Sequence, residues 1–264
     1  MNCLKNAFET AKTDRNGALI IYLTAGYPTM EESEDLFVAA AEAGADILEV
    51  GFPYSDPIAD GPVIQRACQD ALEAGASMRR ILEMVPRIAD RTPTPLVLMT
   101  CFNPILAYGI EEFAADAADA GMTGVLIADM PPSESAMWSE TAQEADLETV
   151  FLAAPTTPEE RLQEIVDRTT GFIYVISSRG VTGERDALPP ELPQRVKTIQ
   201  LMTDVPVAVG FGISSSDQVR QVCDVADGAI VGSAVVSAAL EADSAQNRLR
   251  AVSDAVSMLA GGCR

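Results

Sequence analysis

Two carboxylates, Glu49 and Asp60, are the residues of this chain best suited to chemistry. The segment LEVGFPYSDPIADGP, residues 48–62, sets Glu49 inside an apolar, strand-like run and carries Asp60 at the end of a Pro- and Gly-rich loop. A carboxylate without a partner in an apolar strand is costly, so Glu49 must be neutralised, paired or used. The pair suggests general acid/base catalysis.

Each acidic residue of this segment also has a non-catalytic interpretation. Glu49 could be a structural carboxylate held by neighbouring backbone, and Asp60 could be a turn residue before a Gly-Pro pair. Asp56, in Ser-Asp-Pro, fits ordinary turn chemistry or a contact. Strand alternation places Glu49 on one face with Ile47 and Gly51. We expect that face to point into a partly apolar mouth, where the pKa of Glu49 rises towards a value useful for an acid.

The residue types that are missing or rare exclude several kinds of catalyst. The chain has no histidine, which removes Ser-His-Asp triads, His-ligated metals and imidazole acid/base chemistry. The three lysines follow no strand-like run, which argues against imine chemistry. Five scattered cysteines without a CxxC pair indicate reduced thiols. Proton transfer therefore falls to carboxylates, and we expect no metal.

Charge and hydropathy restrict the partners and the location. A formal net charge of -21 argues against nucleic acid or an anionic membrane as a partner. No apolar run approaches the roughly 18 residues of a membrane span, and the polar N-terminus is unlike a signal peptide. The sequence thus predicts a cytoplasmic protein.

Eight short β-branched runs alternate with amphipathic segments, which predicts a parallel sheet. A (β/α)8 TIM barrel of the phosphate-binding type is expected as one domain, residues 1–264, with an extra N-terminal helix over residues 3–13. A doubly wound open sheet is the alternative. The expected strands cover residues 18–24, 46–51, 96–101, 124–129, 148–153, 172–177, 206–210 and 227–232.

Glycine-containing turns follow the last three expected strands. GFGIS at 210–214 and VGS at 231–233 come after strands seven and eight, where barrels commonly hold phosphate, and SRGVTG at 178–183 follows strand six. One such glycine alone is more often only a turn residue. Three adjoining turns predict a small phosphorylated substrate.

Apolar residues at the expected mouth could form a slot for a flat ring, although such residues more often belong to the core. They are Tyr22, Phe52, Met99, Phe102, Ala128, Tyr174, Val209 and Phe211.

These motifs together resemble the α-subunit family of tryptophan synthase over essentially the full chain. The segment around Glu49 and Asp60 is highly specific for that family, whereas the glycine turns alone indicate only a phosphate-binding barrel. The matching segments are LTAGYP at 23–28, EAGADILEVGFPYSDPIADGP at 42–62, FNPI at 102–105, GVLIADMP at 124–131, SSRGVTG at 177–183, GFGIS at 210–214 and VGSAVV at 231–236.

The resemblance implies a lyase that reversibly cleaves indole-3-glycerol phosphate to indole and glyceraldehyde 3-phosphate, with no cofactor on this chain. It implies that Glu49 is the acid/base and that Asp60 pairs with the indole N-H, with Thr182 closing over the site. The substrate-binding residues that we expect are Tyr22, Phe102, Tyr174, Thr182, Gly183, Phe211, Gly212, Gly232 and Ser233.

The resemblance also implies a partner, the β subunit that carries PLP, in an α2β2 assembly. The expected partner contacts are Pro53, Asp56, Pro57 and Asn103. One departure is Cys101, where many relatives carry a tyrosine that could wall the indole slot. Three alternatives remain open: another enzyme on this barrel such as a phosphoribosyl isomerase, a standalone indole-glycerol-phosphate lyase, and a catalytically weak subunit that activates β.

Overall fold

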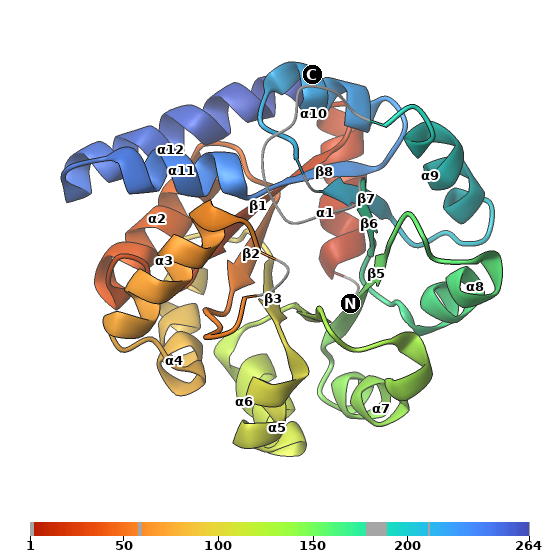
Figure 1. Ribbon diagram of the computed structural model, residues 1–264, viewed down its shortest axis with the longest axis horizontal. Coiled ribbons are helices and arrows are strands. Elements are labelled where there is room, and N and C mark those ends of the chain that lie inside the picture. Colours follow the sequence, from red (N-terminus) through yellow and green to blue (C-terminus); the bar gives the residue numbers. More distant parts are fainter. Residues whose placement is uncertain (1–2, 58–59, 178–188, 211, 264) are drawn as a thin grey trace.

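Eight parallel strands pair in sequence order and close into a barrel in the computed structural model, which describes residues 3–57, 60–177, 189–210 and 212–263 (Figure 1). Strand β1 pairs with β8, with Ala18 opposite Gly228, so the sheet has no open edge. This closure confirms the predicted TIM barrel and shows that the doubly wound alternative is wrong. The strands are β1 (Ala18–Thr24), β2 (Ile47–Gly51), β3 (Leu96–Thr100), β4 (Gly124–Ile127), β5 (Glu148–Ala153), β6 (Ile173–Ile176), β7 (Val207–Gly210) and β8 (Gly228–Val231).

Helices surround the barrel, and the long interval between β2 and β3 holds two of them (Figure 1). Ser77 and Ser215 cap α4 and α10 through their side-chain oxygens, and Gly121 ends α6 in the left-handed conformation. The helices are α1 (Cys3–Asp14), α2 (Met30–Glu42), α3 (Pro62–Glu73), α4 (Met78–Ala89), α5 (Phe102–Tyr108), α6 (Ile110–Ala120), α7 (Ala136–Glu144), α8 (Glu159–Arg168), α9 (Leu192–Gln200), α10 (Ser216–Cys223), α11 (Ser233–Glu241) and α12 (Ala245–Ala260), with 3-10 turns η1 (Pro132–Glu134) and η2 (Gly261–Cys263).

Two apolar clusters form the core because strand side chains alternate between the barrel interior and the helices. In β2, Leu48 and Val50 belong to the outer cluster, whereas Ile47 belongs to the inner one. The inner cluster takes residues from every strand and adds Leu4 and Phe8 of α1. Within the part of the chain that the structure describes, no helix is long and apolar enough to cross a lipid bilayer.

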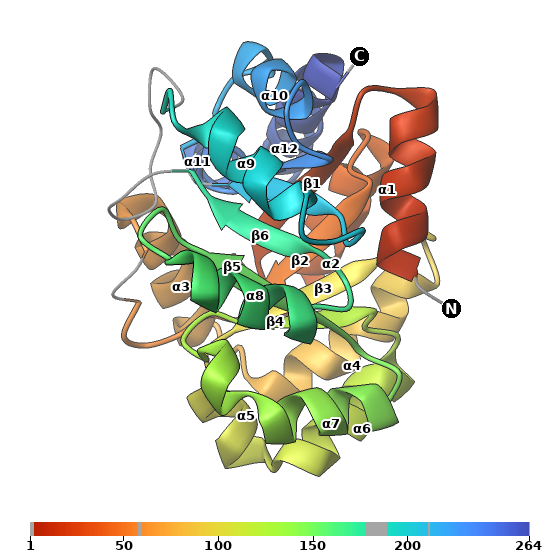
Figure 2. The same cartoon turned by 90° about the vertical axis from the view of Figure 1, so that its right-hand side faces the viewer.

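Helix α1 covers the end of the barrel where the strands begin (Figure 2). Its Leu4 and Phe8 side chains fit there because glycines flank them: a Cβ on Gly171 would lie 2.8 Å from Leu4 Cδ1, and one on Gly228 would lie 2.9 Å from Phe8 Cε1. The Glu148 side chain accepts a hydrogen bond of 3.2 Å from the Leu4 N-H. The first turn of α1 is thereby fixed to the start of β5.

Removing the Leu4 side chain should test whether its packing requires glycine at position 171. Leu4→Ala should reduce the free energy of unfolding by about 3 kcal/mol, because a fully buried leucine is removed. Gly171→Ala should also destabilise the wild type, since the new methyl group meets Leu4. In the Leu4→Ala background the same change should cost less, because the methyl group then enters vacated space. Urea unfolding of the four proteins measures this coupling; additive costs would contradict the packing described.

Candidate active site

Glu49 lies on β2 with its side chain on the inner face, next to Ile47 and near the strand's C-terminal end. It is only 1 % exposed, and its Oε1 has no hydrogen-bond partner among the described residues. Burial raises the pKa of Glu49 to about 8, because the apolar interior disfavours the charged form. At neutral pH the side chain is therefore mainly a neutral acid with a proton to give.

Asp60 lies in the loop between β2 and α3, close to the mouth formed by the strands' C-terminal ends. Its N-H donates to Pro57 O at 3.1 Å, and its carbonyl accepts from Gln65 Nε2 at 2.8 Å. The residue is half-buried, and burial raises the pKa of Asp60 to about 6. The main-chain bonds hold the loop, and the carboxylate is ionised in most molecules at neutral pH.

Two tyrosine rings stand in the mouth, and each lies across a glycine at the end of a strand. A Cβ on Gly51 would come within 2.3 Å of the Tyr22 ring, and one on Gly210 would lie 2.4 Å from the Tyr174 hydroxyl oxygen. Any larger residue at either position would displace a ring. The sequence shows Gly51 and Gly210, but it does not show that each accommodates a tyrosine ring from a neighbouring strand.

The carboxylates and the tyrosines form one group. Burial, followed by the nearby charges of Glu49 and Asp60, raises the pKa of Tyr174 well above its ordinary value. Burial, Cys68 and the same two carboxylates do the same to Tyr22, whose hydroxyl lies 3.5 Å from Thr24 Oγ1. Both phenols are therefore neutral at physiological pH. They can donate hydrogen bonds or contact a ring, but they do not supply charge.

The wall beside this group comes from the end of β3. Cys101 precedes α5, and burial, with Asp129 and Asp60 nearby, raises the pKa of its thiol to about 11. The thiol is therefore a poor nucleophile. Asp129 Oδ1 accepts a hydrogen bond of 2.7 Å from the Phe102 N-H, so it caps α5 from across the loop. The sequence places Asp129 at the end of an expected strand but gives no sign of this capping role.

The turns after β7 and β8, which the sequence predicts to bind phosphate, differ from one another. Gly212 has a φ of 81°, which favours glycine, but α10 begins only at Ser216. The Gln218 side chain accepts hydrogen bonds from the N-H groups of Ser214, at 2.8 Å, and Ser215, at 3.2 Å. Those two amides are thus already paired. Sequence analysis missed Gln218, although its place three residues after Ser215 is the spacing of a capping box.

Helix α11 offers a more open N-terminus. Gly232 is its N-cap and Ser233 is its first residue, and among the described residues this N-terminus has no side-chain cap hydrogen bond. A Cβ on Gly232 would lie 3.2 Å from the Tyr22 side chain, which places this turn beside the mouth. An anion bound by these amides would gain from the positive end of the helix. The expected residues Thr182, Gly183 and Phe211 lie outside the described residues.

The expected partner contacts lie at the ends of neighbouring strands β2 and β3. Asp56 and Asn103 are exposed, Pro57 is half-buried and Pro53 is buried. Leu106, on α5 with Asn103, exposes 56 % of its surface.

One expected mouth residue is misplaced. Val209 is fully buried in the outer cluster, whereas its neighbour Ala208 is in the inner one. Alternation therefore turns Val209 towards the helices, and its prediction as part of the slot is wrong.

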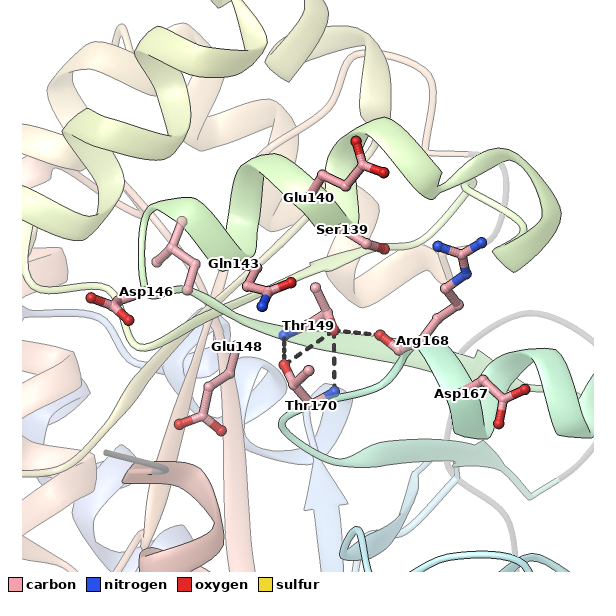
Figure 3. A pocket seen from close by; sticks show the side chains of 10 residues that line it. Ser139, Glu140, Gln143, Asp146, Glu148, Thr149, Asp167, Arg168 and Thr170 are labelled. Carbon is pink, nitrogen blue, oxygen red and sulfur yellow. Dashed lines mark hydrogen bonds between the residues drawn. The ribbon is translucent and has the colours of Figure 1, made fainter.

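A polar depression of about 360 Å³ lies near the start of β5, close to the end of the barrel that α1 covers (Figure 3). Its central groups satisfy one another: Thr149 Oγ1 donates to Arg168 O at 2.7 Å, and the Thr149 N-H donates to Thr170 Oγ1 at 2.8 Å. Glu148 points away from these threonines, and it accepts the α1 amide instead. These bonds give the depression a structural explanation, and the mouth remains the candidate site.

Comparison with known proteins gives a consistent result. A curated tryptophan synthase alpha chain from Geobacter sulfurreducens is 44 % identical over 236 residues, which cover 89 % of each chain. The alpha chain from Streptomyces avermitilis is 41 % identical and covers 99 % of this chain and 94 % of its own length.

Solved structures agree with the sequence relatives. A structure of Mycobacterium tuberculosis tryptophan synthase has a TM-score of 0.91 at 39 % identity, covering 99 % of this chain and 98 % of the other. Tryptophan synthase subunit alpha from Legionella pneumophila has a TM-score of 0.90 at 34 % identity, covering 100 % of this chain and 98 % of its own. The family model described as the tryptophan synthase alpha chain matches residues 8–261. This chain belongs to the tryptophan synthase alpha chain family.

Proposed function

We propose that this chain is the α subunit of a tryptophan synthase and that it cleaves indole-3-glycerol phosphate through Glu49 and Asp60. The observation that carries the assignment is the buried carboxyl group of Glu49, whose Oε1 has no partner among the described residues and whose pKa is about 8. Such a group is a proton donor at neutral pH. It stands inside a mouth that also holds Asp60 and two neutral tyrosines.

The chemistry needs one mobile proton and one fixed negative charge. Neutral Glu49 gives its proton to indole C3, and positive charge then develops on the ring nitrogen. Asp60, ionised above a pKa of about 6, pairs with the indole N-H and stabilises that charge. The Glu49 carboxylate then takes the proton of the glycerol hydroxyl while the carbon-carbon bond to C3 breaks. Indole and glyceraldehyde 3-phosphate leave, and Glu49 regains its starting state.

Binding of the phosphate completes the site. The open first turn of α11, at Gly232 and Ser233, supplies N-H donors, and Gln218 holds the turn that follows Gly212. The acidity of the whole chain, with a formal net charge of -21, opposes an approaching phosphate. Affinity therefore comes from short-range donors. Tyr22, Phe102 and Tyr174 contact the substrate, with Thr182, Gly183 and Phe211 completing the site.

The indole product passes to a β subunit that carries PLP, and this chain needs no cofactor of its own. Pro53, Asp56, Pro57 and Asn103 form the contact with β in an α2β2 assembly. The exposed Asp56 and Asn103, with Leu106 beside them, support this surface because an exposed apolar side chain among polar ones suits an interface. Residues 1–264 act as one domain, in the cytoplasm where this biosynthetic reaction takes place.

Replacing either carboxyl group by the corresponding amide should greatly reduce cleavage without unfolding the protein. Glu49→Gln and Asp60→Asn should each reduce kcat for indole release at least about a hundredfold, with and without a β subunit. The wild type alone should turn over slowly and should be activated by β. Full activity of Glu49→Gln would refute the assigned mechanism, and absence of activation would indicate a standalone lyase.

Stability measurements supply the matched control for Glu49→Gln. In the folded chain the pKa of Glu49 is about 8, compared with 4.5 for an ordinary glutamate, so unfolding releases its proton between these values. The wild type therefore loses stability as pH rises through this window, whereas the glutamine variant lacks the Glu49 contribution and keeps that of Asp60, which ends near pH 6. At pH 9 Glu49→Gln should be the more stable protein in urea unfolding, so its inactivity cannot come from unfolding.

The two pKa values also set the pH profile of catalysis. Cleavage should increase as Asp60 ionises near pH 6 and decrease as Glu49 loses its proton near pH 8. A plot of kcat/KM against pH for the free subunit should be bell-shaped between these limits. The residual activity of Asp60→Asn should keep the alkaline limb and lose the acidic one. A flat profile from pH 5 to 9 would argue against both assignments.

A charge placed at the start of α11 should separate phosphate binding from chemistry. Ser233→Asp should raise KM for indole-3-glycerol phosphate by roughly tenfold or more, because a carboxylate replaces the anion-binding environment with a repulsive one. Ser233→Asn has nearly the same size and no charge, and it should change KM only slightly. Steady-state kinetics of both variants test this. An equal effect of both would show that shape, and not charge, governs the position.

A further inference from the structure

Two buried cysteines that take no part in the proposed reaction face each other. Cys223 ends α10, Cys263 ends η2, and their Sγ atoms lie 3.8 Å apart across 40 residues of sequence. They are 5 % and 0 % exposed, respectively. Both are free thiols, and the Cys223 S-H donates to the Cys263 sulfur.

The surroundings of the pair already hold the two elements together. Gly262 packs so closely that a Cβ there would lie 2.2 Å from Ser216 O at the start of α10. The Asn16 N-H donates to Cys263 O at 2.6 Å, and a Cβ on Gly17 would lie 3.0 Å from Cys223 Sγ. The thiols therefore meet where the end of η2 touches both α10 and the residues that lead into β1.

We propose that Cys223 and Cys263 are a modification site at which a peroxide forms an intrachain disulfide in the folded protein. A disulfide bond is about 2.05 Å long, so the sulfurs must approach each other by less than about 2 Å. A Cβ on Gly17 would lie 3.0 Å from Cys223 Sγ, so glycine at this position keeps a side chain away from the pair.

The reaction begins at Cys263. Its pKa is lowered by the hydrogen bond from Cys223 and by the nearby Arg15 guanidinium, although burial and the Asp46 carboxylate act in the opposite direction. The Cys263 thiolate attacks one peroxide oxygen, the O-O bond breaks, and hydroxide leaves, which yields a sulfenic acid. The Cys223 sulfur then displaces the sulfenic oxygen as water, and its own proton leaves with it. Two thiols are oxidised, and one hydrogen peroxide is reduced to two waters.

The other cysteines do not share this arrangement. Burial raises the pKa of Cys68 and of Cys101 to about 11, so both stay protonated and react slowly. Cys3 is exposed and could link two molecules, which makes Cys3→Ser a suitable background for the test.

The disulfide bond between Cys223 and Cys263 would link the segment that follows α12, the last helix around the barrel, to α10. Helix α12 runs directly into η2 and packs against α2, α11 and β1. A covalent link from η2 to α10 would close a loop of 40 residues' separation and restrict the unfolded chain. By the entropy of loop closure, the melting temperature should rise by roughly 10 °C.

The test treats the folded Cys3→Ser protein with hydrogen peroxide and analyses it without reducing agent. The expected result is a mass lower by about 2 Da, a fall from four titratable thiols to two, and one cross-linked peptide pair containing residues 223 and 263. Calorimetry should show the higher melting temperature, and dithiothreitol should reverse it.

Cys223→Ser and Cys263→Ser in the same background are the matched controls, and neither should gain a cross-link or melting temperature on oxidation. The proposal is overturned if the folded parent keeps four thiols, if oxygen adds to Cys263 without a cross-link, or if the link forms only in denaturant. Peptide mapping of the parent decides these outcomes even if a serine variant fails to fold.

Discussion

The narrow interior of an eight-stranded barrel is the constraint on which the rest of this structure depends. At both ends of the barrel, large side chains pack against glycines, where a Cβ would collide with them. At the closed end, Gly171 and Gly228 make room for Leu4 and Phe8 of α1. At the mouth, Gly51 and Gly210 make room for the rings of Tyr22 and Tyr174. The same packing rule therefore closes one end of the barrel and shapes the reactive end.

Glu49 derives its character from this dry interior. Below it lies Ile47 of the inner cluster, and around it lie tyrosines that stay neutral. Burial disfavours its charge and its Oε1 has no hydrogen-bond partner among the described residues, so the proton is retained. The cost of burying a carboxyl group is thus the source of its usefulness as an acid, in keeping with the tendency of functional sites to be locally unfavourable. The pKa of Asp60, which lies in a loop and is half-buried, is raised less, so Asp60 keeps its charge. Two chemically similar groups acquire different protonation states because they differ in exposure.

Sequence alone predicted the barrel because its signals are local: apolar runs, alternating helices and turn glycines recur with one period. The inward direction of the Glu49 side chain could also be predicted from sequence, since strand alternation places it on the same face as Ile47. The prediction for Val209 was wrong, because strand alternation places it on the face opposite to Gly210, towards the helices. Asp129 and Gln218 were missed for different reasons. Asp129 caps a helix that starts 27 positions earlier, a contact that only tertiary structure creates. Gln218 has a local capping pattern, but its significance depends on which amides a ligand can reach.

Helix α1 also limits the path by which a product can leave the barrel. Leu4 and Phe8 pack into the inner cluster at the end where the strands begin, so within the described residues that end of the barrel is filled by side chains. A planar product released beside Glu49 cannot drain through the far side. It leaves at the opposite end, where the strands have their C-terminal ends. Helix α1, although remote from the reacting atoms, thus restricts the product to one end of the barrel. Whatever protein covers that end therefore receives the product.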